Sequence, residues 1–184
     1  LRALFFLQRP FPHFYVGTPF NKTPRAICNT HRAYDSLDLT TIPEDYLPRT
    51  NYVPDCSVIE YRERTPTVPW DGSRVTEHYR LTSRSMLPTS CERTLISTLL
   101  PPQTAHINGV QSTTFKSLSH LITTASIVNS IPSDFYIKST GKANLHYIWL
   151  DLPLVDLLIT QLHARTLLLN CLTSHYADLW SECY

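Results

Sequence analysis

The chain has 184 residues, of which 42% are hydrophobic and 17% charged, and its formal net charge is +1. This composition excludes a wholly disordered chain and fits one domain of moderate size, with or without a loop-rich extension. No stretch approaches the ~20 apolar residues of a membrane span, and the five cysteines show no C-x-x-C spacing, so we expect no membrane partner, reduced thiols and a cytoplasmic location.

Residues 1–74 read as a Pro-rich arm with an aromatic and basic segment. Twelve of the 14 prolines lie in the first 102 residues, and proline removes backbone donors, so long helices are not expected there. Residues 1–35 favour short strands and turns. A short helix is predicted in "CSVIEYRERT", capped by Asp55, and "PTVPWDGS" is typical of a turn.

Residues 75–184 are predicted to form the second unit, which begins with one helix and two strands. "VTEHYRLTSRSML" is predicted as a helix with Val75, Tyr79 and either Met86 or Leu87 on roughly one face, ended by Pro88. "RTLISTLLPP" is rich in aliphatic and β-branched residues and predicts a buried strand. "AHINGVQSTTF" alternates and predicts a second strand, with a bulge at Gly109.

Helices are predicted over the rest of the chain. Apolar residues recur at helical spacing from Leu118 to Ser130, Pro132 ends or kinks that helix, and a further helix resumes before a turn at Gly141. Leucines at similar intervals predict one long helix over residues 156–182. The expected fold class is therefore α+β, with a small mixed or antiparallel sheet, several packed helices and a preceding Pro-rich arm.

Motifs for catalysis are missing. The chain has only four glycines and lacks GxxxxGK[ST], GxGxxG and an Asn-Pro-Pro-aromatic loop. A metal-dependent nuclease needs clustered carboxylates. Asp55, Glu60 and Glu63 are the nearest approach, and their spacing is better explained by helix capping and surface charge. We therefore assign no catalytic residue and no metal ligand.

Charge is distributed in zones along the chain. Residues 1–34 carry five basic groups and no acid, and residues 93–142 carry four basic groups and one acid. An acidic zone separates them. The two basic zones could combine into a phosphate-binding surface in the fold, or they could be an ordinary solvated surface.

The order of short motifs resembles one family. "CERTLISTLLPPQTAHINGVQSTTF", then a helix, then "IPSDFYIKSTGKANLHYIWLDLPLV", resembles the specificity region of large adenine-specific DNA methyltransferases of restriction-modification systems, with a TaqI-like C-terminal specificity domain. "TPFNKTPRAICNTHRAYDSLDLTTIPEDYLPRTNYVPD" and "TPTVPWDGSRVTEHYRL" are similar to upstream parts of the largest members. The elements that carry the resemblance are Arg93-Thr94, Pro101-Pro102, Ile107 to Phe115, Leu118 to Ser130, Ile131 to Lys142 and Leu152-Pro153.

The resemblance implies a function and partners. It implies a target-recognition region that binds double-stranded DNA, and a catalytic domain, earlier in the same polypeptide, that uses S-adenosylmethionine. No cofactor is expected in this chain itself, which is expected to be a non-catalytic fragment. Its start at Leu1 rather than Met fits a piece of a longer polypeptide.

Residue types suggest where DNA would be contacted. In "KSTGKANLH", Lys138 and Lys142 could contact phosphates, Ser139 and Thr140 could add hydroxyl contacts, and Asn144 or His146 could reach a base edge. Alternatively, Ser139, Thr140 and Asn144 cap helices while both lysines are solvated.

Arg93 and Lys116 complete the DNA-binding prediction. Arg93 could reach DNA or pair with a nearby acid, and Lys116 lies at the exit of the second predicted strand. His106, Gln111 and Thr113 are polar positions close by, which are also plausible contacts by residue type alone.

Two other functions stay open. A protein-interaction or scaffolding domain of a larger enzyme is suggested by Tyr, Trp and Arg near "YVPD" and "TVPWDG", because these residue types are enriched in interface hot spots. A hydrolase with a Cys or Ser nucleophile is the remaining alternative, but sequence order cannot establish the geometry of such a site.

Overall fold

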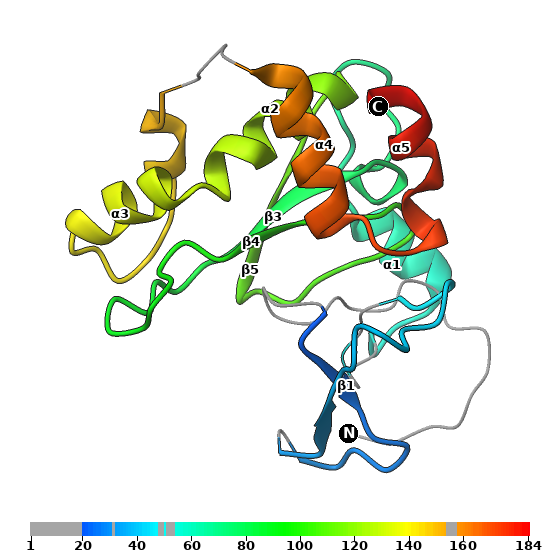
Figure 1. Cartoon of the computed structure of the whole chain (residues 1–184). Coiled ribbons are helices and arrows are strands. Elements are labelled where there is room, and N and C mark those ends of the chain that lie inside the picture. The colour runs from blue at the N-terminus through cyan, green and yellow to red at the C-terminus, as the bar shows by residue number, and fades with distance from the viewer. Residues whose placement is uncertain (1–19, 31, 48–49, 51–53, 154–157) are drawn as a thin grey trace.

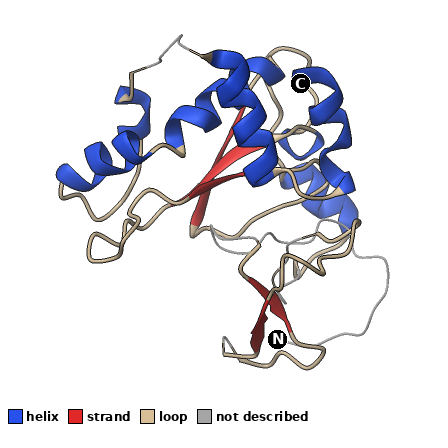
Figure 2. Cartoon of the chain, viewed as in Figure 1, coloured by secondary structure: helices blue, strands red, loops and turns tan. Residues whose placement is uncertain are grey.

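The computed structural model describes residues 20–30, 32–47, 50, 54–153 and 158–184 (Figure 1). Within those residues the chain forms two small antiparallel sheets and five α-helices, an α+β arrangement (Figure 2). The predicted fold class is confirmed. Much of the predicted Pro-rich arm lies outside the described residues, so its extended form stays a prediction.

A two-stranded hairpin lies beside the main body, near the bottom of Figure 1. Its strands are β1 (Lys22–Pro24) and β2 (Tyr34–Ser36), with Thr23 opposite Asp35. The Arg25 Nε donates a hydrogen bond of 2.8 Å to Asp35 Oδ1. Short strands were expected here, and the described part confirms them.

The helix predicted in the arm is present as α1 (Val58–Arg64), but its cap differs from the prediction. The Ser57 Oγ, not the Asp55 carboxylate, accepts a hydrogen bond from the Glu60 N–H. Ser57 holds the extended backbone that a capping residue adopts, directly before the first helical turn. The predicted turn that follows is closed by a β-bridge between Thr67 and Arg74, with Gly72 at φ 73°.

The main sheet has three strands in the order β4-β3-β5. They are β3 (Arg80–Arg84), β4 (Ser97–Leu100) and β5 (Val110–Thr114), and both pairings are antiparallel. The two strands predicted in residues 93–115 are confirmed.

The helix predicted over residues 75–87 is wrong. Only a 3₁₀ turn, η1 (Val75–Glu77), precedes β3. Residues 79–83 are all buried, so the strand shows no alternation of buried and exposed positions, and its pairing with β4 and β5 overrides the local helical spacing.

The two predicted helices after β5 are confirmed. The first, α2 (Leu118–Val128), is capped by Ser117 and buries Leu121, Ile122 and Ala125. The second, α3 (Ile131–Ser139), is capped by Ser130. Pro132 lies in the first turn of α3, where no helical hydrogen bond is lost, and Gly141 adopts φ 65° after its end.

The single long helix predicted over residues 156–182 is wrong. A short 3₁₀ helix, η2 (Ile148–Asp151), is followed by α4 (Ile159–Asn170), η3 (Ser174–Tyr176) and α5 (Ala177–Cys183). Residues 154–157 lie outside the described residues. The chain leaves the helical conformation at Cys171, and the Tyr176 hydroxyl then donates to the Leu99 carbonyl at 2.9 Å.

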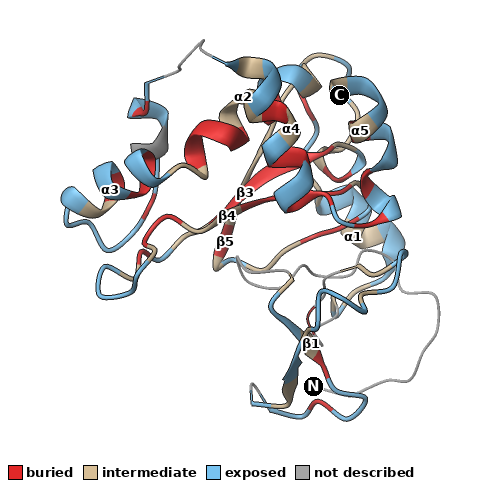
Figure 3. Cartoon of the chain, in the orientation of Figure 1, coloured by how far each residue is buried: buried red, intermediate tan, exposed pale blue. Residues whose placement is uncertain are grey.

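The core lies between the main sheet and α2, α4 and α5, as the red segments of Figure 3 show. Full burial of one such aliphatic side chain stabilises a fold by roughly 1.5–3 kcal/mol. No helix in the described parts of the chain is long and apolar enough to cross a membrane. The principal core residues are Tyr79, Leu81, Leu95, Leu99, Leu121, Ile122, Ala125, Ile137, Leu145, Leu167, Tyr176 and Leu179.

Candidate nucleic-acid interface

A polar concavity borders strand β5, and we call it the edge hollow. It encloses about 400 Å³. The lining comes from three segments: the connection between β4 and β5, strand β5 itself, and the chain that follows Gly141. The lining residues are His106, Gln111, Ser112, Thr113, His146 and Tyr147.

Strand β5 has an unpaired outer edge among the described residues, because β3 lies on one side of it and no strand lies on the other. The Ser85 N–H donates to the Gly109 carbonyl at 3.0 Å. Since bonding alternates along an antiparallel pair, the backbone groups of Gln111 and Thr113 face β3. Those of Ser112 therefore face outward into the edge hollow.

The wall that carries His106 is fixed by a buried arginine. Arg80 is 2% exposed, and its guanidinium donates to the Thr104 carbonyl. The Thr104 hydroxyl donates in turn to the Pro101 carbonyl at 2.6 Å. Burial lowers the pKa of Arg80 to about 10, which leaves it charged at neutral pH.

The opposite wall is fixed by a short bridge to the extension of β3. The Leu145 N–H donates to the Ser85 carbonyl at 2.8 Å, and the Leu87 N–H donates to the Ala143 carbonyl at 2.9 Å. The Leu145 side chain is fully buried. His146 then adopts φ 41°, a left-handed conformation that is unfavourable for a side chain of its size.

The lining contains hydroxyl, amide, imidazole and phenol groups, and it contains no carboxylate. Basic residues adjoin two lining segments. Lys116 follows the end of β5 and Lys142 precedes His146, and both are exposed. Arg84 lies opposite Val110 at the start of β5. A surface of this kind favours polar, anionic ligands over cationic ones.

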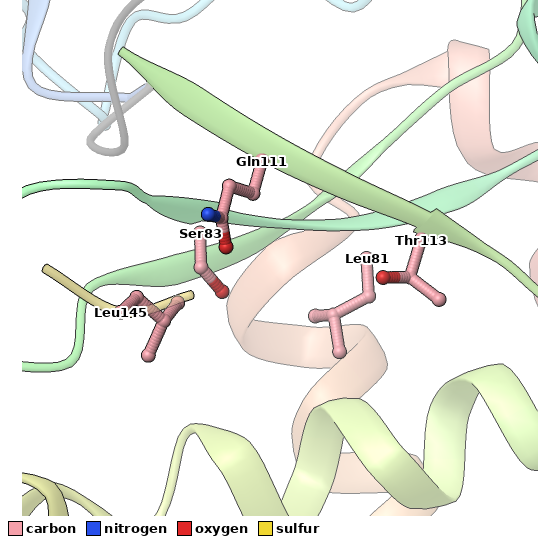
Figure 4. Close-up of a pocket in the computed structure, with 5 residues that line it drawn as sticks. All are labelled: Leu81, Ser83, Gln111, Thr113 and Leu145. Atoms are coloured by element: carbon pink, nitrogen blue, oxygen red, sulfur yellow. The ribbon is translucent and has the colours of Figure 1, made fainter. Parts of the chain in front are cut away.

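A second, much smaller pocket lies on the helix-covered face of the sheet. It encloses about 10 Å³, room for about one water molecule, so it is not a ligand site. Figure 4 shows Leu81, Ser83 and Thr113 directing their side chains to this face.

Three predicted contact residues at the end of α3 already hydrogen-bond to backbone carbonyls. The Lys138 Nζ donates to the Cys91 carbonyl at 2.9 Å. The Ser139 and Thr140 hydroxyls donate to the Tyr136 and Ile137 carbonyls, each at 2.7 Å. The two hydroxyls therefore satisfy carbonyls at the end of a helix, as the alternative interpretation of them expected, and their contact with DNA stays a prediction.

Arg93 forms an ion pair with an acidic residue, which was the predicted alternative to a contact with DNA. Its Nε lies 3.3 Å from Asp134 Oδ2, and its Nη2 donates to the Asn129 carbonyl at 3.1 Å. Asp134 Oδ1 accepts the Thr94 and Leu95 N–H groups at 2.8 and 2.6 Å. Arg93 thus joins α3 to the segment before β4.

The remaining predicted residues lie at or near the edge hollow. His146 lines it, and Lys116, Lys142 and Asn144 are exposed on the adjoining segments. The backbone of Asn144 pairs with Met86. The structure therefore separates this second half of "KSTGKANLH" from the first half at the end of α3.

Sequence reasoning missed Ser112, Tyr147 and Arg84. Tyr147 is 79% exposed. In the sequence, the signal for it was an aromatic residue close to a turn that contains two lysines. Arg84 and Ser112 could not be found in this way, because their positions depend on the pairing of β3 with β5.

The described residues give no alternative metal site. No three His, Cys, Asp or Glu side chains among them gather closely enough to hold a metal ion. Glu60, one member of the carboxylate set considered for a nuclease, pairs with Arg64 at 2.6 Å. All five cysteines are free.

Comparisons of the chain with protein-family models, with curated proteins and with solved structures found no significant match. They add no support to the resemblance to DNA methyltransferases.

Proposed function

We propose that the chain is a DNA-recognition module that contacts DNA through the edge hollow. The observation that carries this proposal is the lining itself: six polar or aromatic side chains, no carboxylate, and exposed lysines on two adjoining segments. Phosphates are bound by Lys and Arg, and base edges by amide, imidazole and hydroxyl groups.

The polar groups of the edge hollow have separate roles in this proposal. Lys116 and Lys142 contact phosphates on either side of the hollow. Gln111 and His146 supply donors and acceptors to a base edge, and Tyr147 offers a ring for stacking or apolar contact. The two anchored walls hold these groups in place before DNA arrives, which lowers the entropy cost of binding.

The wider context comes from the sequence resemblance. In that context the chain is the target-recognition part of an adenine-specific DNA methyltransferase of a restriction-modification or related defence system. The catalytic domain and S-adenosylmethionine then belong to another part of the polypeptide. The resemblance, not the geometry, supports this half of the proposal.

The direct experiment is fluorescence anisotropy of random-sequence duplex DNA titrated with the chain across a salt series. We expect affinity to fall steeply with salt, because each phosphate contact releases a counterion. The double variant Lys116→Ala, Lys142→Ala should lower the slope of log affinity against log salt by about two.

The matched control is Lys22→Ala in β1, an exposed lysine in the separate hairpin. It removes a like charge and should leave the slope unchanged. Absence of binding at low salt, or equal slopes for the double variant and wild type, would contradict the proposal.

A protein-interaction role is the second candidate, and α3 carries the observation that favours it. Ile131 and Phe135 are 74% and 71% exposed and lie four residues apart, on one face of the helix. Exposed apolar side chains of this size are typical of surfaces covered by a partner. Phe135→Asp should leave DNA binding intact, which separates the two roles.

A further inference from the structure

Three hydroxyl groups lie within hydrogen-bond distance of a histidine ring in the described part of the chain. Ser73 Oγ lies 2.6 Å from His78 Nε2, Ser112 Oγ lies 2.8 Å from His106 Nε2, and Thr123 Oγ1 lies 2.8 Å from His163 Nε2. The three contacts differ in which atom supplies the proton and in access to solvent.

At Ser73 the histidine has to be the donor. The Ser73 hydroxyl has one proton, which it donates to Asp71 Oδ1 at 2.5 Å. The Ser73 oxygen can then only accept from His78 Nε2. A histidine that donates to a serine does not activate it, so this contact is structural.

At Ser112 the hydrogen bond runs in the opposite direction, from the serine to the histidine. His106 Nδ1 lies 3.1 Å from the Ile107 carbonyl oxygen, which can only accept, so Nδ1 carries the proton. In the neutral ring Nε2 is then an acceptor, and the Ser112 hydroxyl donates to it. A serine, a base and a group that orients the base are thereby arranged in the order that nucleophilic catalysis requires.

Ser112 and its histidine also differ from the Thr123 pair in their surroundings. Ser112 and His106 both line the edge hollow. Thr123 contacts His163, which is buried within the fold. The Ser112 N–H faces the same hollow, so a neutral donor is available to an oxyanion.

We propose that Ser112 is a nucleophile activated by His106, and that the edge hollow accepts small uncharged carboxylic esters. The Ser112 oxygen bonds to the ester carbonyl carbon as its proton passes to His106 Nε2. The carbon–oxygen bond to the alcohol then breaks, and the alcohol leaves with that proton. Water then gives a proton to His106 Nε2 as its oxygen bonds to the acyl carbon. The bond from that carbon to the Ser112 oxygen breaks, the proton passes from His106 to Ser112, and the acid leaves.

This inference goes beyond DNA recognition and does not depend on it. The experiment is labelling of the DNA-free chain with a tagged fluorophosphonate, which reacts with activated serines and avoids confusion from the five thiols. We expect Ser112 to be labelled, as located by peptide mass mapping. The rate should exceed that of the urea-unfolded chain at least tenfold and be lost in acid, where the imidazole is protonated.

Variants separate activation from packing. Ser112→Ala should abolish labelling, and His106→Gln should lower its rate about 100-fold, the scale of general-base catalysis. Ser73→Ala should label as wild type. Equal labelling of the folded and unfolded wild-type chain would overturn the proposal without reference to any variant, and so would unchanged labelling in His106→Gln.

Discussion

The end of α3 and the edge hollow carry similar polar side chains but use them differently. At the end of α3, Lys138, Ser139 and Thr140 donate to backbone carbonyls of their own fold. Around the edge hollow, Lys142 and Tyr147 project into solvent. The difference teaches that residue type identifies a candidate contact, while the fold already uses some of these groups for its own hydrogen bonds.

If the comparison holds, changes near α3 should affect stability and changes at the edge hollow should affect binding. The largest expected effect is from Asp134→Ala in α3. It leaves two buried N–H groups without their acceptor and Arg93 without its paired carboxylate, which should lower the free energy of unfolding by about 3 kcal/mol. Urea unfolding measures this, and DNA affinity of the folded fraction should not change.

Tyr147→Ala should have the next largest effect, on binding alone. Loss of an aromatic contact with a base costs roughly 1–3 kcal/mol, so affinity should fall about tenfold. The exposed ring has few contacts to lose, so the unfolding midpoint should stay close to that of wild type. Tyr184→Ala, an equally exposed tyrosine at the end of the chain, is the control. Equal losses of DNA affinity in both variants would contradict DNA binding at the edge hollow.

His163 gives the smallest effect, on the pH dependence of stability. Burial lowers its pKa below the ordinary value of 6.5, so the unfolded chain takes up the proton more readily than the folded chain. Stability should therefore fall as pH drops below about 6.5. His163→Gln should make that fall shallower in urea titrations at several pH values. An unchanged pH profile would show that other groups control acid stability.

Local patterns were enough to predict α2, α3 and the two outer strands of the main sheet. Leu118, Leu121 and Ala125 follow the helical period, and α2 appears where they predict it. Pro101 and Pro102 mark the end of the strand segment that contains β4. These features depend on neighbours in sequence, so a single sequence reveals them.

The errors arose where distant residues decide the structure. Tyr79 and Met86 share a helical spacing, yet β3 forms because β4 and β5 pair with it on both sides. Arg93 finds its partner Asp134 on α3, far along the chain. The same holds for the candidate site. The sequence identified Lys142 and His146, but the contact between Ser112 and His106 became visible only in the folded structure.

The measurement that tests the account most directly is the salt dependence of DNA affinity for two single variants, Lys142→Ala and Lys138→Ala. Each removes one lysine from the same short segment, but only Lys138 already donates to a carbonyl of the fold. The account predicts that Lys142→Ala lowers the salt slope by about one and Lys138→Ala leaves it unchanged. Equal slopes for the two variants, or a larger loss with Lys138→Ala, would contradict it.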